Sequence, residues 1–398
     1  MTTDFDIVVI GGGPCGATAA TDLARNGWRV ALMDKAGRIK PCGGAIPPRC
    51  IRDFDIPDAQ LVAKINTARM ISPTGRHVDI PIEHGYVGMV DREHFDEFLR
   101  ERAAEAGAAR LTGTFLSVDR SGGVTTVVYR PKEKDAEPRM VTTRMILGAD
   151  GARSNVARQE IPDGGEIDYV IAYHEIIKAP DAAHAPESYH AKRCDVVYDG
   201  AISPDFYGWV FPHGEQASIG MGTGLKDFDL KAATSALRES SGLAGCETIR
   251  KEGAPIPLKP MKRWDNGKDV LVAGDAAGVV APSSGEGIYY AMCAGRHAAE
   301  AMHLALAKEN PRKLRLARRR FMREHGLVFR VLGQMQDTWY RSDDRRERFV
   351  SMCHDVDIQR LTFEGYMHKR LVFAKPLAHA RIFLKNCAHL ARLIPARS

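Results

Sequence analysis

Asp6-Ile-Val-Val-Ile-Gly-Gly-Gly-Pro-Cys-Gly16 is the stretch that decides the fold expected for this chain of 398 residues. Ile7 to Ile10 form a β-branched apolar run, which predicts a buried parallel strand. Gly11, Gly13 and Gly16 follow with the spacing G-x-G-x-x-G. In this pattern the first glycine allows a tight turn, the second lets the backbone approach a pyrophosphate, and the third lets a helix pack on the strand. The stretch therefore predicts a dinucleotide-binding site.

An acidic residue ends the next predicted strand. Arg29 to Met33 form that strand, and Asp34 follows it directly. A carboxylate in this place can accept hydrogen bonds from both hydroxyls of an adenosine ribose, while it disfavours a 2′-phosphate. The helix that follows the glycines points its N-terminus at the phosphates. This first site therefore suits FAD or NAD better than NADP.

The composition is that of an ordinary globular protein. The eight cysteines are scattered without a C-x-x-C pair, so we expect neither a metal site nor a disulfide framework. Asp4 and Asp6 stand where a signal peptide would carry basic residues, and no apolar run has membrane-spanning length, so we expect a cytoplasmic protein.

The net charge of +6 is unevenly distributed along the chain, because residues 312–398 hold 20 Lys and Arg against 8 Asp and Glu. Such a tail favours an anionic surface as partner, and without zinc-finger or RNP-type patterns we expect no nucleic acid.

Two further glycine–acid motifs follow predicted buried strands. They are Gly148-Ala-Asp150-Gly-Ala-Arg-Ser154 and Gly274-Asp275-Ala-Ala-Gly278. Together with the first motif, they resemble the FAD-binding set of the p-hydroxybenzoate-hydroxylase-like flavoproteins. The resemblance implies that Asp150 and Gly151 lie near the pyrophosphate and ribityl chain, and that Asp275 holds a ribityl hydroxyl. It also implies that Arg92, at the start of the second helix, contacts the cofactor.

Pro282-Ser-Ser-Gly-Glu-Gly-Ile288 leads into a further helix. Its N-terminus would lie beside the flavin ring and stabilise negative charge there, by about 0.3–1 kcal/mol. This arrangement favours a flavin used as a hydride donor and also fits a monooxygenase. The predicted cofactor-binding residues are Gly11, Gly13, Pro14, Gly16, Asp34, Gly43, Gly44, Arg92, Asp150, Gly151, Gly274, Asp275, Gly285, Gly287 and Ile288.

The combined pattern predicts an α/β fold, in which a Rossmann-type FAD-binding domain is interleaved with a mixed β-sheet substrate domain and followed by a basic helical C-terminal region. Strand-like alternation with turn residues marks the substrate domain. The expected boundaries are 1–66, 85–164 and 265–310 for the FAD-binding domain, 67–84 and 165–264 for the substrate domain, and 311–398 for the C-terminal region.

Pro41-Cys-Gly-Gly44 and Tyr207-x-Trp209-x-Phe211-Pro212-x₇-Gly220-x-Gly222 decide between these chemistries. Both resemble motifs of the geranylgeranyl reductase family, which saturates isoprenoid double bonds. Alternation on a strand puts the three aromatic rings on one sheet face, which suits a polyprenyl chain, and the predicted substrate-binding residues are Tyr207, Trp209, Phe211, Gly220 and Gly222. The alternative is that the rings are a core face. Cys42 either packs against its neighbours or acts as a lid or redox group over the flavin.

Within this family the chain is most similar to the bacteriochlorophyll-pathway member, which reduces a geranylgeranyl group to phytyl. The resemblance implies FAD as cofactor and NADPH as the donor, with ferredoxin as the alternative. The substrate would be the free diphosphate, the esterified pigment or an archaeal-type lipid, and a pigment synthase is a further partner. The proton donor is open among Glu286, Tyr207 and His213. A flavin monooxygenase and a non-catalytic carrier of prenylated pigments are the rival hypotheses.

The segment from Leu377 to Ile394 contains no acidic residue. On a helix, Arg381, Lys385 and Arg392 fall on one face, opposite a largely apolar one. This pattern predicts either a helix in an anionic membrane interface or an amphipathic helix packed on the protein's own core. Under the first hypothesis the protein is peripherally bound to the cytoplasmic face of a membrane.

Overall fold

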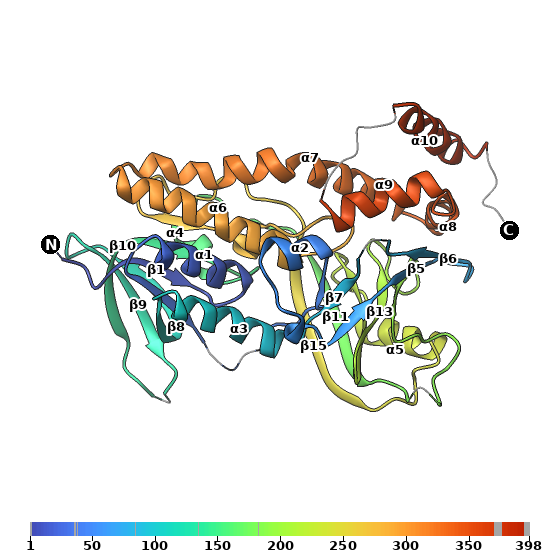
Figure 1. Cartoon of the computed structure of the whole chain (residues 1–398), viewed down its shortest axis with the longest axis horizontal. Coiled ribbons are helices and arrows are strands. Elements are labelled where there is room, and N and C mark those ends of the chain that lie inside the picture. Colours follow the sequence, from blue (N-terminus) through green and yellow to red (C-terminus); the bar gives the residue numbers. More distant parts are fainter. Residues whose placement is uncertain are drawn as a thin grey trace. The chain divides into compact units, whose positions relative to one another are not determined.

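The computed structural model describes residues 2–35, 37, 39–83, 85–133, 135–181, 183–369 and 376–393. The chain folds as two compact units, and many of its helices and strands are labelled in Figure 1. Unit 1 consists of Met1–Lys40, Arg92–Tyr169 and Pro255–Leu327. Unit 2 consists of Pro41–Asp91, Val170–Ala254 and Val328–Ser398.

This division differs from the predicted domains. Residues 41–66 and 85–91, expected in the FAD-binding domain, belong to unit 2, whereas residues 255–264 belong to unit 1. Part of the reason is a small sheet in unit 2, in which β7 pairs with both β3 and β4. No local sequence pattern predicts this pairing. The tail is not a region of its own, because α7 begins in unit 1 and ends in unit 2. The strands of the small sheet are β3 (Ala45–Ile46), β4 (Ala63–Ile65) and β7 (Val87–Met89).

Unit 1 is built on five parallel strands in the order β8-β2-β1-β10-β16. A sixth strand, β9, pairs antiparallel with both β8 and β10. The central strands are apolar along their length because both faces of a parallel sheet are covered. The prediction of a Rossmann-type arrangement is confirmed. The strands are β1 (Phe5–Ile10), β2 (Val30–Asp34), β8 (Ala109–Asp119), β9 (Thr125–Pro131), β10 (Arg139–Gly148) and β16 (Val270–Val272).

Small residues set the helix packing in unit 1. Pro14 is the first residue of α1, where its fixed φ suits a helix start and its missing N–H costs nothing. A Cβ on Gly295 of α6 would lie 2.3 Å from the Cys15 carbonyl oxygen, so only glycine lets α6 approach α1 this closely. The helices are α1 (Pro14–Arg25), α3 (Arg92–Glu105), α4 (Asn155–Glu160), η2 (Gly274–Ala277), α6 (Ile288–Ala307) and η3 (Pro311–Arg315).

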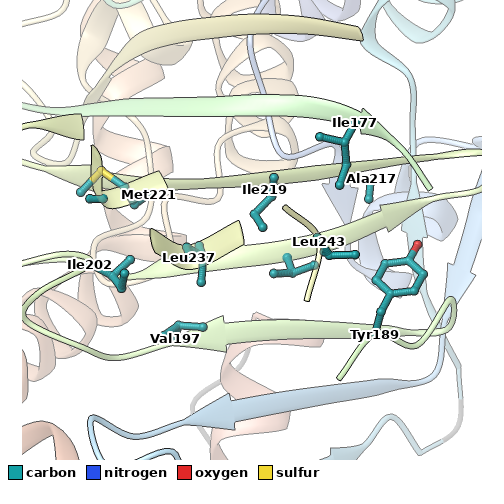
Figure 2. Close-up of a cluster of buried hydrophobic side chains, with 11 residues drawn as sticks. Ile177, Tyr189, Val197, Ile202, Ala217, Ile219, Met221, Leu237 and Leu243 are labelled. Carbon is teal, nitrogen blue, oxygen red and sulfur yellow. The ribbon is translucent and has the colours of Figure 1, made fainter. Parts of the chain in front are cut away.

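Unit 2 is built on a seven-stranded sheet in the order β15-β11-β14-β13-β12-β5-β6. The aliphatic cluster drawn in Figure 2 takes alternate residues of these strands, such as Val210, Ile219 and Ile177, together with Ala233 and Leu237 of α5. Helix α5 therefore covers one face of the sheet. The elements are β5 (Thr67–Ile71), β6 (His77–Pro81), β11 (Tyr169–Lys178), β12 (Arg193–Val197), β13 (Gly208–His213), β14 (Gln216–Thr223), α5 (Leu230–Ser240) and β15 (Thr248–Pro257).

The C-terminal part is helical, as predicted. None of the helices in the described part of the chain combines the length and the hydropathy of a bilayer-crossing segment. The predicted helix over 377–394 is α10, which ends earlier, and Ile394 lies outside the described residues. The remaining helices are α2 (Pro48–Asp53), η1 (Asp58–Gln60), α7 (Leu316–Trp339), α8 (Asp343–Met352), α9 (Val356–Met367) and α10 (Pro376–Leu390).

Candidate active site

The three glycine–acid motifs follow β1, β10 and β16, which are neighbouring parallel strands. Their carboxyl ends therefore meet at one edge of the sheet of unit 1, where ligands of such sheets bind. Within the first motif the glycines differ in their surroundings. A Cβ on Gly16 would lie 1.9 Å from the Gly11 carbonyl oxygen, and one on Gly11 would lie 2.3 Å from the Ala149 carbonyl oxygen. A Cβ on Gly13 would meet no atom within 4 Å. The open space at Gly13 leaves room for a pyrophosphate to approach the backbone, and that contact stays a prediction.

Asp34 and Arg100 brace the first glycine loop. The Gly12 amide donates to Asp34 Oδ2 at 2.7 Å, and Arg100 Nη1 donates to the Gly12 carbonyl oxygen at 3.3 Å. The same guanidinium nitrogen lies 3.8 Å from Asp34 Oδ1. Asp34 remains partly exposed and keeps acceptor capacity for ribose hydroxyls. Arg100 was not predicted, because nothing near it in the sequence refers to the glycine loop.

Asp275 follows β16 and carries an ion pair. Its carboxylate contacts the ammonium group of Lys40, which immediately precedes the Pro41-Cys-Gly-Gly44 stretch. Gly274 has φ +65, and a Cβ there would lie 2.8 Å from Cys15 Cβ, so glycine is required where the chain turns past α1. The ion pair brings a cation to the place predicted for a ribityl hydroxyl. Lys40 was missed in the sequence because it is 235 positions from Asp275.

The Asp150 carboxylate holds the turn into α4. Its Oδ2 accepts from the amides of Asn155 at 2.7 Å and Val156 at 3.2 Å, and its Oδ1 accepts from the Ser154 hydroxyl. Burial raises the pKa of Asp150, although these hydrogen bonds oppose the shift. Gly151 has φ +88, and a Cβ on it would meet nothing within 4 Å. A contact of either residue with FAD stays a prediction.

Arg92 is buried at the start of α3. Its guanidinium makes a two-pronged ion pair with Asp96, with donor–acceptor distances of 2.8 and 2.7 Å. This pair fixes the side chain one turn into the helix. The predicted contact with the cofactor stays untested.

The last predicted cofactor segment leads into α6. Gly285 has φ +63, and Gly287 is the N-cap residue directly before Ile288, the first residue of the helix. The first amides of α6 have no partner within the helix and carry its positive dipole end. Unit 1 therefore fits FAD, with open space at Gly13 and Gly151, a carboxylate after β2 and a helix N-terminus. Gly43 and Gly44, also predicted for the cofactor, belong to unit 2.

The aromatic strand of unit 2 presents a continuous row of rings. The ring centroids of Tyr207 and Trp209 are 6.0 Å apart, and those of Trp209 and Phe211 are 6.2 Å apart. These residues alternate with Val210, which lies in the aliphatic cluster, so the rings occupy the other face of the sheet. Tyr207 and Trp209 are buried and Phe211 is half-buried. The row is thus a packed part of unit 2, distinct from the core under α5.

Two sequence motifs that are far apart in the chain meet in unit 2. A Cβ on Gly43 would lie 3.3 Å from the Phe211 ring, and one on Gly44 would lie 2.5 Å from His213 Nε2. The Gly44 amide also points at the sulfur of Cys42, at 3.4 Å. The glycines therefore let this loop lie directly on the end of the aromatic strand. Cys42 is half-buried, and its predicted lid or redox role stays untested.

Gly220 and Gly222 make room for neighbouring side chains. A Cβ on Gly220 would lie 2.4 Å from His174 Cβ, and one on Gly222 would lie 3.0 Å from the Phe206 ring. Their predicted contact with substrate stays untested. His213 donates from Nδ1 to the Phe211 carbonyl oxygen at 2.9 Å, and burial lowers the pKa of His213. At neutral pH His213 is therefore uncharged, which weakens it as a proton donor.

Comparison with known proteins agrees with this geometry. The model of an FAD-binding domain matches residues 4–314. The chain is 64% identical to the geranylgeranyl diphosphate reductase of Rhodobacter capsulatus, over 98% of each chain. The chain belongs to the geranylgeranyl reductase family. The chloroplastic geranylgeranyl diphosphate reductase of Oryza sativa is 37% identical over 98% of this chain and 87% of that protein.

A solved structure supports the fold of this family. The geranylgeranyl bacteriochlorophyll reductase-like protein of Thermoplasma acidophilum superposes with a TM-score of 0.79 at 22% identity, covering 92% of this chain and 97% of that one. The resemblance drawn from the sequence motifs is confirmed. As a member of the geranylgeranyl reductase family, the chain is an FAD-dependent oxidoreductase.

Proposed function

We propose that this enzyme saturates C=C bonds of a geranylgeranyl group, converting it to phytyl in bacteriochlorophyll or chlorophyll biosynthesis. The relative from Rhodobacter capsulatus is named for geranylgeranyl diphosphate, and it matches this chain along nearly its whole length. The observation that carries the proposal is the ring row of Tyr207, Trp209 and Phe211 on a sheet face separate from the aliphatic core. An apolar aromatic surface of this kind suits a long chain of isoprene units.

The residues of unit 1 would hold the cofactor. Asp34 would accept hydrogen bonds from the adenosine ribose, Gly13 would admit the pyrophosphate, and Asp275, paired with Lys40, would bind a ribityl hydroxyl. FAD, when bound, supplies the two-electron hydride chemistry of the reaction. NADPH is the proposed electron donor.

The residues around the substrate have a demanding task, because an isolated trisubstituted alkene is a poor hydride acceptor. The protein must exclude water, align the prenyl chain and hold a proton donor beside the reacting carbon. The aromatic row and the Pro41-Cys-Gly-Gly44 loop would exclude water and align the chain. With neutral His213 disfavoured, Glu286 and Tyr207 remain as proton-donor candidates.

Anaerobic incubation tests the function directly. The purified protein would be mixed with FAD, NADPH and either geranylgeranyl diphosphate or geranylgeranyl-bacteriochlorophyll, and the products weighed by mass spectrometry. We expect gains of two hydrogens per step, over three steps. A gain of oxygen when air is admitted would identify a monooxygenase, and tight binding without a mass change would identify a carrier. Comparison of the two substrates distinguishes the free diphosphate from the esterified pigment, and replacement of NADPH by reduced ferredoxin tests the donor.

We also propose that α10 lies on a membrane surface, but in an orientation that differs from the simple basic-face picture. Arg381 pairs with Asp355 at 2.9 Å and with Asp357 at 2.7 Å, and Lys385 pairs with Asp355 at 2.8 Å. Arg392 lies 3.4 Å from Asp344, so all three predicted lipid-facing cations pair with carboxylates of the same unit. Leucines of this segment are exposed instead, with Leu384 at 67%, Leu390 at 43% and Leu393 at 78%.

The proposed contact with the bilayer is therefore mainly apolar, with support from the positive charge of the tail. We expect co-sedimentation with anionic liposomes, a modest loss of binding as salt rises, and loss of binding after truncation before Pro376 with FAD retained. The triple change of Leu384, Leu390 and Leu393 to Ser should abolish binding in the full-length protein. Binding that survives this change would place the contact elsewhere, as would a truncated protein that still sediments.

A further inference from the structure

A row of polar residues crosses four strands of unit 2 beneath the aromatic strand. Trp209 on β13 lies opposite Gly220 on β14, and Gly220 lies opposite His174 on β11. Because a Cβ at Gly220 would collide with His174, the missing side chain lets the two rings approach, with centroids 6.1 Å apart. Glu252 on β15 lies next, with its Oε2 3.1 Å from His174 Nε2.

Ser218 is the junction of this row. Its Oγ accepts a hydrogen bond from Trp209 Nε1 at 3.1 Å and lies 2.9 Å from His174 Nδ1. His174, Ser218 and Trp209 are all buried, and Ser218 has no exposed surface. Glu252 is tied in turn to Arg250 at 2.9 Å. Burial raises the pKa of Glu252, but the contacts with His174 and Arg250 outweigh it and hold the pKa below its ordinary value. The row therefore ends on a charged carboxylate at neutral pH.

We infer that Glu252, His174 and Ser218 are positioning residues, which fix the plane of the Trp209 ring against which the prenyl chain lies. The inference rests on the proposed function. The indole N–H has one direction in which it can donate, and the Ser218 hydroxyl sets it. His174 and Glu252 hold that hydroxyl in place from the far side. The hydrogen bonds of the row converge on Ser218, whereas Glu252 approaches His174 Nε2 without hydrogen-bond geometry. Hydrogen-bonded groups in a buried, low-dielectric place hold one another rigidly.

A fixed ring matters because three successive double bonds must each reach the same reacting position. A ring that rotates would change the shape of the wall and let the chain settle out of register. Loss of Ser218 should therefore affect product formation more than folding, and it should act only through Trp209.

A double-mutant cycle tests this dependence. The variants are Ser218→Ala, Trp209→Phe and the double variant, assayed with FAD, NADPH and geranylgeranyl diphosphate. Phe keeps a ring but lacks the N–H donor, so Ser218 has nothing to orient in that background. We expect Ser218→Ala to lower kcat/KM by about three- to tenfold and to raise the share of partly saturated products, with no further loss in the double variant. Glu252→Gln should show a smaller loss, also absent in the Trp209→Phe background. Independent, multiplying losses would overturn the inference, and so would an unchanged Ser218→Ala enzyme.

Two controls separate positioning from folding and from the proposed function itself. Thr234→Val removes a buried hydroxyl of α5, which donates to the Leu230 carbonyl oxygen at 2.8 Å, away from the aromatic face. Thr234→Val should lower the melting temperature as much as Ser218→Ala does, without changing the product pattern.

The second control needs no turnover. With ¹⁵N-labelled tryptophan the four indole N–H resonances can be observed, and that of Trp209 is assigned by its loss in Trp209→Phe. It should move in Ser218→Ala and Glu252→Gln but not in Thr234→Val. An unmoved resonance overturns the inference even in an active enzyme, whereas a moved resonance in a protein that reduces no prenyl substrate means that only the proposed function has failed.

Discussion

Unit 1 and unit 2 each carry a candidate site, and the two candidate sites are assembled over different distances along the chain. In unit 1, the three glycine–acid motifs each follow one of the neighbouring strands β1, β10 and β16. In unit 2, Trp209, Ser218 and His174 come from three strands and meet only through sheet register. A nucleotide site is made mostly of backbone space, whereas a wall for an apolar chain is made of side chains on one face. The nucleotide site depends on glycines and turns, and the apolar wall depends on which strands pair and in which register.

A pair of glycine substitutions in unit 1 should give the largest difference. Gly16→Ala puts a Cβ 1.9 Å from the Gly11 carbonyl oxygen, so we expect a loss of about 3 kcal/mol or more in the free energy of unfolding. Gly13→Ala has open space around its Cβ and should change the stability of the FAD-free protein by no more than about 0.5 kcal/mol. It should nevertheless weaken FAD binding. Urea unfolding and flavin titration measure the two effects, and equal stability of both variants would contradict the reading of the glycine loop.

A second pair contrasts the two faces of the sheet in unit 2. Leu237→Ala, in the cluster of Figure 2, should cost about 2–5 kcal/mol of stability and leave turnover per folded molecule intact. Trp209→Ala should retain full FAD content and lower prenyl saturation at least about tenfold, because its ring is assigned to the substrate wall. Flavin absorbance, flavin reduction by NADPH and product mass are measured separately. A folded Trp209→Ala enzyme with normal turnover would make the aromatic row a second core face and nothing more.

Asp275→Ala tests the cofactor side alone. Loss of a buried acceptor costs about 1–3 kcal/mol, so FAD affinity should fall by about 10- to 100-fold. Lys40 would also lose the partner of its ammonium group. The measurement is the flavin absorbance of the purified variant, with Asp275→Asn as the matched control for charge. Full stoichiometric flavin in Asp275→Ala would remove this residue from the site.

The smallest effect concerns α10 and pH. Burial raises the pKa of Asp355, but the contacts with Lys385 and Arg381 outweigh it and lower the pKa to about 2. Because the folded pKa lies below the unfolded value of about 4, the pair stabilises the protein above pH ~4, and the contribution disappears as pH falls towards 2. We expect Asp355→Asn to cost about 1–2 kcal/mol at pH 7, reduced by the exposure of Arg381.

The same variant supplies its own control. The difference in unfolding free energy between wild type and Asp355→Asn should shrink steadily between pH 4 and 2. A difference that stays constant over this range would mean that the carboxylate contributes through something other than its charge. Such a result would also weaken the orientation assigned to α10.

The predictions made from the sequence succeeded where a residue type at a given spacing can serve only one structural purpose. Gly11 and Gly16 are required by contacts of under 2.5 Å, and Pro14 starts α1 where predicted. The tail was predicted to be helical and is helical, but the role of its cations was not visible. Arg381 and Lys385 bind Asp355, which precedes α9, and a helical wheel drawn for one helix cannot show a partner on another.

The unit boundaries show the same limit. The composition of residues 41–66 does not show which unit they join, and β4 pairs with β7 in a small sheet of unit 2. Strand pairing between residues 63–65 and 87–89 is a choice among many partners of similar propensity. The local sequence pattern predicts where strands form, and the packing of the whole chain decides which strands pair.

By itself, the sequence determined the dinucleotide-binding fold, because this depends on glycine spacing, strand-end acids and alternation, all of which act within a few residues. The same motifs carried the resemblance that implied FAD and the family. Only the tertiary structure decided that Lys40 meets Asp275, that the Pro41-Cys-Gly-Gly44 loop lies on Phe211, and that Trp209 is held through Ser218 by His174 and Glu252. The physical reason is the short range of these interactions in space. A hydrogen bond or an ion pair acts over about 3–4 Å in space and carries no trace in the sequence when its partners lie tens or hundreds of residues apart.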